Sequence, residues 1–304
     1  MWLLSVVVFI ILRMAPGDAA VAALARAPGE GALNVEQLGA KRRELGLDRA
    51  WPVQYAAWAA DIARLDAGRS AATGLPVLDE IVPRLWVTAE LVLLTLALVA
   101  ALGLGLGGLA AAQRGRAADV AARALALVSL SAPAFWVGLL LIIAVASWTG
   151  IFIASSFVPL FDHPAANLRT LGAAALVLSI RPAALVARVV RVSTVDALAQ
   201  DFVRAARARG LSERAVLWRH AFRSASLPAL TVLGAEAVYL LGGSVVIEQL
   251  FGLPGIGRAV AAGVLERDYP LVQFATLMFG GAALTVNLVA DVAYARLDPR
   301  VRLA

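Results

Sequence analysis

Long apolar runs alternate with basic segments along this chain. Residues 86–112, 124–148, 170–190, 227–250 and 271–297 are each near the length of about 20 residues that crosses a bilayer. Residues 1–13 are also apolar but too few to span alone, so we expect a first span whose first half is missing. Arginines cluster after alternate runs, which places those segments on the cytoplasmic side. Six spans would leave both termini in the cytoplasm.

This pattern predicts an all-α polytopic membrane protein. We expect one transmembrane domain over residues 1–304. It contains span one at 1–13, a polar extracytoplasmic subdomain at 14–85 and a five-span core at 86–304. Pro133 lies inside the predicted third span and should kink that helix near mid-membrane.

Composition and motifs exclude a soluble domain and several classes of enzyme. Of the 304 residues 61% are hydrophobic, which is too apolar for a soluble domain. Cysteine is absent, so no disulfide or thiolate metal site can form. Lys41 is the only lysine and is followed by Arg42, so the chain has no P-loop. His163 and His220 form no HExxH motif, and Ser244 lies in no GxSxG motif. We therefore expect no enzymatic activity and no bound cofactor in this chain.

The net charge of +6 comes almost entirely from arginine. In a membrane protein such an excess reflects topology, so we predict lipid contact and no nucleic-acid binding.

The segment from Asp201 to Pro228 is the most strongly charged one between two apolar runs. Its pattern predicts a helix, a turn at Gly210, and a second helix that ends at Leu227–Pro228. Ser212 should be the N-cap of that second helix, with Glu213 in its first turn. Such a cytoplasmic hairpin could be a solvated loop that only sets topology, or it could bind a partner.

The motif Ala205-Ala206-x-x-x-Gly210 resembles the EAA loop of ABC-importer permeases, and Gly243–Tyr269 resembles a second stretch of the same proteins. The longer pattern is similar to the first permease subunit of the dipeptide, oligopeptide and nickel importers. Arg204 departs from the family pattern, which has an acid there. Arg181 inside span four is a second departure.

The resemblance implies a type I importer fold of about six transmembrane helices in a prokaryotic cell membrane. It implies that the chain forms half of a translocation pathway for peptides or nickel. The implied partners are a second permease subunit in a heterodimer, two ATPase subunits that bind ATP and magnesium, and an extracytoplasmic substrate-binding protein.

The resemblance also assigns roles to particular residues. It makes residues 196–226 the coupling loop, with ATPase contacts at Asp201, Arg204, Ala205, Ala206, Gly210, Leu211, Ser212 and Glu213. Independently of the resemblance, the glycines of Phe251–Gly257 predict a tight turn that begins a short extracytoplasmic helix near Arg258. Pro254, Gly255 and Gly257 would let a partner permease or the binding protein approach the backbone, or the segment could be an ordinary loop.

Charged residues inside apolar spans are costly and often functional. Arg181, Glu236 and Glu248 are therefore candidates for the pathway. Arg181 could instead snorkel or pair with Glu236, because it lies only seven residues, roughly 10 Å, from Arg188. The intramembrane acids leave open an alternative function, that of an ion-coupled secondary transporter. The run from Leu65 to Asp79 is a hint of nickel-type relatives.

Overall fold

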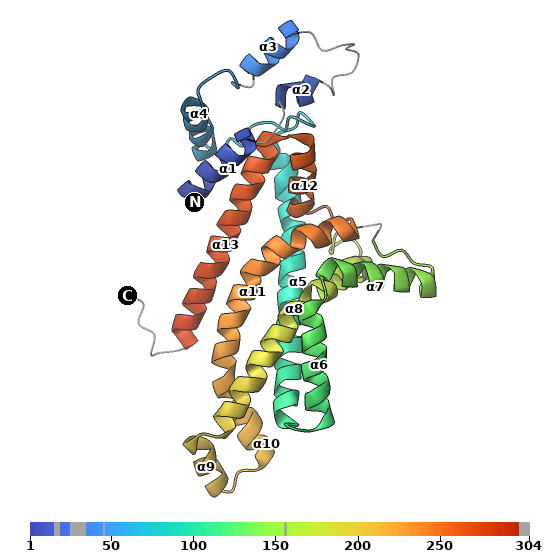
Figure 1. Cartoon of the computed structure of the whole chain (residues 1–304), viewed down its shortest axis with the longest axis vertical. Coiled ribbons are helices and arrows are strands. Elements are labelled where there is room, and N and C mark those ends of the chain that lie inside the picture. Colours follow the sequence, from blue (N-terminus) through green and yellow to red (C-terminus); the bar gives the residue numbers. More distant parts are fainter. Residues whose placement is uncertain (15–18, 25–34, 45, 155–156, 298–304) are drawn as a thin grey trace. The chain divides into compact units, whose positions relative to one another are not determined.

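The computed structural model describes residues 1–14, 19–24, 35–44, 46–154 and 157–297 (Figure 1). Within these residues the chain is helical, as predicted. Parts of the expected extracytoplasmic subdomain (15–18, 25–34 and 45) and the residues after Leu297 lie outside the described residues. The helices are α1 (Trp2–Met14), α2 (Ala19–Leu24), α3 (Val35–Glu44), α4 (Trp51–Ala63), α5 (Val77–Ala112), α6 (Ala117–Ser131), α7 (Ala134–Thr149), α8 (Pro164–Leu198), α9 (Asp201–Ala208), α10 (Glu213–Ala215), the π-helix η1 (Val216–Ala221), α11 (Phe222–Phe251), α12 (Ile256–Glu266) and α13 (Tyr269–Leu297).

Four helical segments of the described chain are long and apolar enough to cross a membrane. They are Val77–Ala112, Pro164–Leu198, Glu213–Phe251 and Tyr269–Val292. The pair α6 and α7 makes a fifth if the two helices form one bent span. The expected first span is the 13-residue helix α1, which is too short to cross a bilayer.

The predicted third span is broken rather than kinked. Helix α6 ends at Ser131, α7 begins at Ala134, and the two helices meet at 104°. Pro133 lacks a backbone N–H, and its ring forces Ala132 out of the helical region to φ −80° and ψ 128°. The backbone therefore leaves the helix completely at this point.

The described residues form two compact units. The first contains Met1–Thr88 and Pro254–Ala282, and the second contains Ala89–Leu253 and the residues from Ala283 onward. The predicted extracytoplasmic subdomain at 14–85 thus shares a unit with α1, α12 and the beginning of α13. The sequence did not indicate this association.

A buried core holds the first unit together. It includes Val77 and Ile81 of α5, Ile256 of α12, and Leu271 and Ala275 of α13. These side chains come from segments nearly 200 positions apart, and burying them removes apolar surface from water.

Asp268 fixes a turn in the first unit to the start of α13. Its carboxylate is only 1% exposed and accepts hydrogen bonds from the Ser70 hydroxyl and from the N–H groups of Ala71 (3.1 Å) and Leu271 (3.3 Å). An acid at a helix N-terminus also interacts favourably with the helix dipole. The hydroxyl of Thr88 similarly accepts the Ile256 N–H at 2.9 Å, at the beginning of α12.

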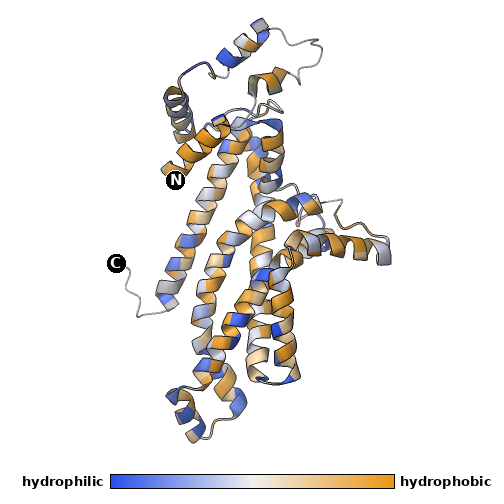
Figure 2. Cartoon of the chain, viewed as in Figure 1, coloured by the Kyte–Doolittle hydropathy of each residue, from blue (hydrophilic) through white to orange (hydrophobic). Residues whose placement is uncertain are grey.

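In the second unit, α8 packs against α11, α6 and α7 (Figure 1). Val99 of α5, Val186 and Val190 of α8, and Ala229 of α11 form a buried cluster. Hydropathy colouring shows apolar residues along α6 and α7 and many polar residues on α9 and α10 (Figure 2).

Candidate functional site

Helix α9 ends in a Schellman motif built around Gly210. The Gly210 N–H donates to the Arg207 carbonyl (2.9 Å), and the Leu211 N–H donates to the Ala206 carbonyl (3.3 Å). Gly210 has φ +80°, a left-handed conformation that glycine adopts without steric cost. The predicted turn at Gly210 is confirmed.

The second arm of the hairpin begins at Ser212. Its hydroxyl accepts the Ala215 N–H at 3.4 Å, so Ser212 is the predicted N-cap of α10. Across the turn, Arg207 Nε donates to Glu213 at 2.8 Å and Arg207 Nη2 donates at 3.0 Å. These hydrogen bonds to a carboxylate raise the pKa of Arg207 above its ordinary value. The pair joins the two arms directly.

One prediction about the hairpin is wrong. The second arm does not end at Leu227–Pro228, because α10 continues through η1 into α11 and Pro228 lies inside α11. The six residues of η1 are wound as a π-helix, a form that is rare and usually short. A continuous helical path therefore joins the hairpin to a membrane-length segment.

The hairpin has its own small core. Val203 and Ala206 of α9 and Val216 of η1 are buried together. Apart from Ala206, all the predicted coupling residues are exposed: Asp201, Arg204, Ala205, Gly210, Leu211, Ser212 and Glu213. Arg204 forms an ion pair with Asp201. The large apolar side chains of Phe202, Leu211 and Trp218 are also partly exposed. The outer surface of the hairpin thus mixes apolar and cationic side chains on a rigid support.

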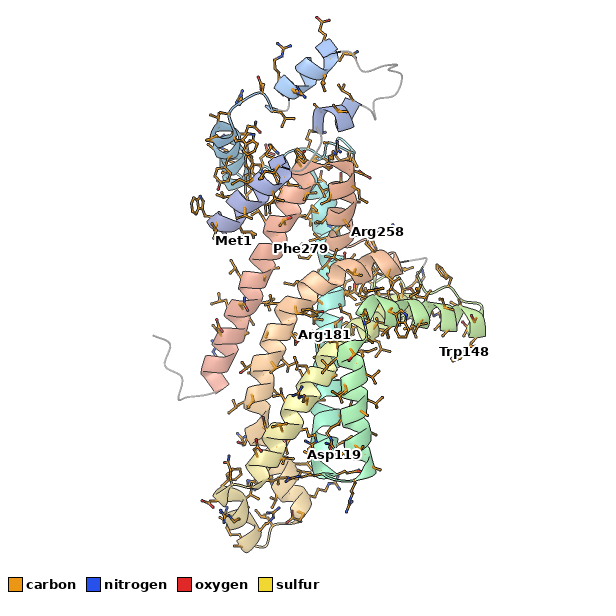
Figure 3. The ribbon with its side chains drawn as sticks, viewed as in Figure 1. Met1, Asp119, Trp148, Arg181, Arg258 and Phe279 are labelled. Carbon is orange, nitrogen blue, oxygen red and sulfur yellow. The ribbon has the colours of Figure 1, made fainter. Side chains whose placement is uncertain are left out.

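Arg181 of α8 lies beside α11 in the second unit (Figure 3). Its Nη1 is 3.5 Å from Glu236 Oε2, and its guanidinium carbon is 4.5 Å from the centroid of the Tyr239 ring. The predicted alternative of pairing with Glu236 is therefore observed. The Arg181 side chain nevertheless remains 38% exposed. Among the described residues, neither Arg181 Nη1 nor Glu236 Oε2 has a hydrogen-bond partner, and both atoms are buried. Any further polar contact of Arg181 must therefore come through the exposed remainder of its side chain.

The other predicted site residues are placed differently. Glu248 is fully buried, so its side chain does not face an open pathway on this chain. Gly255 and Gly257 are also buried, and only Pro254 of the predicted contact turn is exposed. Gly255 has φ −91°, whereas the left-handed residue of this turn is Gly252 at φ +66°. The expected helix after the turn is present as α12.

Sequence reasoning missed an ion-pair cluster around Asp119, at the beginning of α6 (Figure 3). Asp119 is 1% exposed and accepts hydrogen bonds from Arg191 Nη2 (2.8 Å) and from the Gly115 N–H (2.9 Å). Arg123 lies 3.6 Å away on the same helix as Asp119. Asp119 is the only acid among residues 113–133, and this isolation in a basic segment was the available signal.

Among the described residues, no group of three or more His, Asp or Glu side chains is positioned to hold a metal ion. The membrane-length helices of the described chain define a class: a multi-pass membrane protein.

The family follows from comparison with known proteins. Residues 103–303 match the family described as the binding-protein-dependent transport system inner membrane component. The chain belongs to this family.

Relatives support the assignment along nearly the whole chain. A Brucella abortus (strain 2308) protein named as a peptide transport system permease is 37% identical over 302 residues, covering 99% of this chain and 95% of the relative. The glutathione transport system permease protein of Shigella boydii is 35% identical and covers 99% of this chain and 94% of the relative. A crystal structure of an amino acid ABC transporter has a TM-score of 0.54 at 20% identity, covering 71% of this chain and 92% of that one, which supports the fold.

Proposed function

We propose that this chain is a permease subunit through which an ATP-driven importer moves peptides across the cell membrane. The observation that carries this proposal is the exposed hairpin, α9 and α10, which is joined by unbroken helix to α11. A chain without a P-loop must take energy from a partner or do without it, and a helical lever is a suitable place for a partner to apply force.

The assembly we propose has a second permease subunit, two ATPase subunits and an extracytoplasmic binding protein. The ATPase subunits bind ATP and magnesium and contact the hairpin surface that includes Phe202, Leu211 and Arg204. Both termini and the hairpin lie in the cytoplasm, where the arginine clusters favour them. Movement of the hairpin would rock α8 and α11 and change the side to which the pathway opens.

The substrate is proposed from the relatives' names and from charge. The relatives cited above are named for peptide and glutathione transport, and both kinds of substrate carry carboxylates. Arg181 is exposed enough to donate to such a carboxylate while it stays beside Glu236. Family membership favours this function over the ion-coupled secondary transporter.

The test is transport by the reconstituted complex in proteoliposomes. We expect uptake of a labelled peptide that depends on the binding protein and on ATP. Uptake of nickel without peptide uptake would assign the chain to the nickel branch. Peptide uptake driven by an ion gradient in the absence of ATPase subunits would refute the proposal.

A further inference from the structure

The first unit contains a cavity of about 240 Å³. Its walls come from α1, α4, the turn at residues 66–71 and the beginning of α13, whose positions along the chain can be followed in Figure 1. The wall residues that matter for its chemistry are Arg13, Trp58, Asp61, Asp66, Tyr269 and Gln273. None of these residues belongs to the hairpin or to the Arg181–Glu236 pair.

Arg13 is held in place from several sides. Its Nε donates to Gln54 Oε1 at 2.9 Å, and Gln54 in turn donates to the carbonyls of Leu47 (3.3 Å) and Arg49 (2.8 Å). The guanidinium carbon lies 4.7 Å from the centroid of the Phe9 ring and 5.0 Å from that of Tyr269. Stacking of this kind orients a guanidinium group and leaves its edge free to donate.

Two residues that line this cavity each have a buried donor with no hydrogen-bond partner in the part of the chain that the structure describes. One is Nη1 of Arg13, and the other is Nε2 of Gln273, a residue that is only 3% exposed. Leaving a buried donor unsatisfied is unfavourable, and more so when the group is charged. A ligand that supplies acceptors would remove this cost at both atoms.

The chemistry of the walls indicates what that ligand is. A guanidinium and a carboxamide N–H both donate, and a carboxylate has two oxygens to accept from them. The aromatic rings of Trp58 and Tyr269 form an apolar part of the cavity wall, against which the carbon atoms of a ligand can pack. The exposed acids Asp61 and Asp66 supply negative charge on the same cavity, which suits an ammonium group.

We propose that this cavity is a binding site for a small zwitterion, of amino-acid to dipeptide size, whose carboxylate accepts from Arg13 and Gln273. The ammonium group of the ligand is balanced by Asp61 and Asp66. The wall residues of this site do not include Arg181 or Glu236, and its ligand class overlaps with the proposed peptide substrate.

The experiment measures binding and not transport, so its result is independent of the proposed function. The full chain is placed in lipid nanodiscs, without a binding protein or ATPase subunits, and titrated with alanyl-alanine. Saturation-transfer NMR and thermal stability report binding. The probes for comparison are alanyl-alanine amide, which lacks the carboxylate, N-acetyl-alanyl-alanine, which lacks the ammonium, and inorganic phosphate.

We expect the amide to bind about 10- to 100-fold more weakly than alanyl-alanine, as the loss of hydrogen bonds to a charged group implies. Gln273→Met keeps the side-chain size and should weaken alanyl-alanine binding about tenfold. Because Gln273 Nε2 makes no bond in the free protein, this variant should unfold at the same or a higher temperature. Arg13→Gln should bind more weakly still, and Gln113→Met, an exposed glutamine elsewhere, serves as the matched control.

Four results would overturn the inference: no binding of alanyl-alanine at millimolar concentration, equal binding of the amide, equal binding of phosphate, or unchanged binding by Gln273→Met. If Arg13→Gln fails to fold, Gln273→Met decides the question alone. A loss of transport activity in the reconstituted complex has no bearing on these binding results.

Discussion

Gly210 shows how one residue shapes the hairpin. Its φ of +80° lies where a β-branched residue is strained, and a Cβ there meets nothing within 4 Å. Gly210→Val therefore acts through the backbone alone and should cost about 1–3 kcal/mol of local strain. We expect normal membrane insertion but loss of substrate-stimulated ATPase activity in the purified complex.

Gly150 provides the matched control for this prediction. It also has positive φ (+70°) and open space around it, but it caps α7 outside the hairpin. Gly150→Val should keep ATPase coupling, and Gly210→Asn should keep it as well because Asn tolerates the left-handed region. Normal stimulation in Gly210→Val would show that the turn is not needed for coupling.

Asp119 is the residue whose change should affect stability most directly. Asp119→Asn removes the charge that Arg191 and Arg123 share and leaves Arg191 without its carboxylate. We expect the free energy of unfolding to fall by about 2–3 kcal/mol, measured in detergent by thermal or chemical unfolding. Asp162→Asn, at an exposed acid, should change it little. Equal stability of the two variants would contradict a role for the Asp119 cluster.

Arg181 separates a structural role from a pathway role. Arg181→Gln should lower uptake of anionic peptide roughly tenfold while basal ATPase activity persists, because one charge-assisted donor is lost. Arg181→Lys should recover part of the uptake. The measurement is uptake into proteoliposomes together with ATPase activity.

The control is the double variant Arg181→Gln, Glu236→Gln. It removes both charges of the pair, so Glu236 is not left as an unpaired carboxylate on α11. If Arg181 only neutralises Glu236, the double variant should transport normally. Continued loss of anionic transport would support the pathway role, whereas failure of the Arg181→Gln complex to assemble would assign the pair to structure.

At the scale of elements, the contact between α5 and α8 depends on glycine. A Cβ added at Gly107 would lie 2.6 Å from the Ala187 carbonyl oxygen, and one at Gly103 would lie 2.6 Å from a methyl carbon of Val186. Backbone cannot move aside as a flexible side chain can, so the helices must separate. The small residues at these two positions thus set the distance between the helices.

Gly107→Ala should destabilise the protein by about 1–3 kcal/mol through overpacking. Gly105 lies on the same helix with nothing within 4 Å of its added Cβ. Gly105→Ala should therefore be neutral or stabilise the helix by about 0.5–1 kcal/mol. Thermal unfolding in detergent compares the two, and a similar loss in both variants would contradict the packing argument.

Proline has different effects in different helices of this chain. The helix breaks between α6 and α7 but continues from α10 into α11. Pro133 follows a residue forced into an extended conformation and ends a helix, whereas Pro182 and Pro228 lie inside α8 and α11. Neighbouring packing keeps these last two helices intact, because α8 and α11 make extensive contact with each other.

At the scale of the whole molecule, the orientation in the membrane can be tested directly. The chain has no cysteine, so single cysteines report their side without background. Ser212→Cys in the hairpin should react with a membrane-impermeant maleimide only when the cytoplasmic side is open. Leu75→Cys, at an exposed position of the first unit, should react in intact cells. The opposite labelling pattern would invert the proposed topology.

Much of this protein follows from local sequence alone. Apolar runs of membrane length predict four of the long helices, because only a helix satisfies its backbone polar groups within a bilayer. Gly210 and Ser212 predict the hairpin turn and its cap, because their conformations and hydrogen bonds involve residues no more than a few positions away. The resemblance in the hairpin and in Gly243–Tyr269 led to the correct family.

Tertiary structure alone decided the rest. It paired Arg181 with Glu236 and Asp119 with Arg191, and it buried Glu248, Gly255 and Gly257, which the sequence had suggested for pathway or partner contacts. It also placed the unpartnered donors of Arg13 and Gln273 on one cavity. Residues this far apart in the chain come into contact only when the helices pack together. Hydropathy and local spacing therefore do not predict which charged residues become neighbours or which glycines are buried.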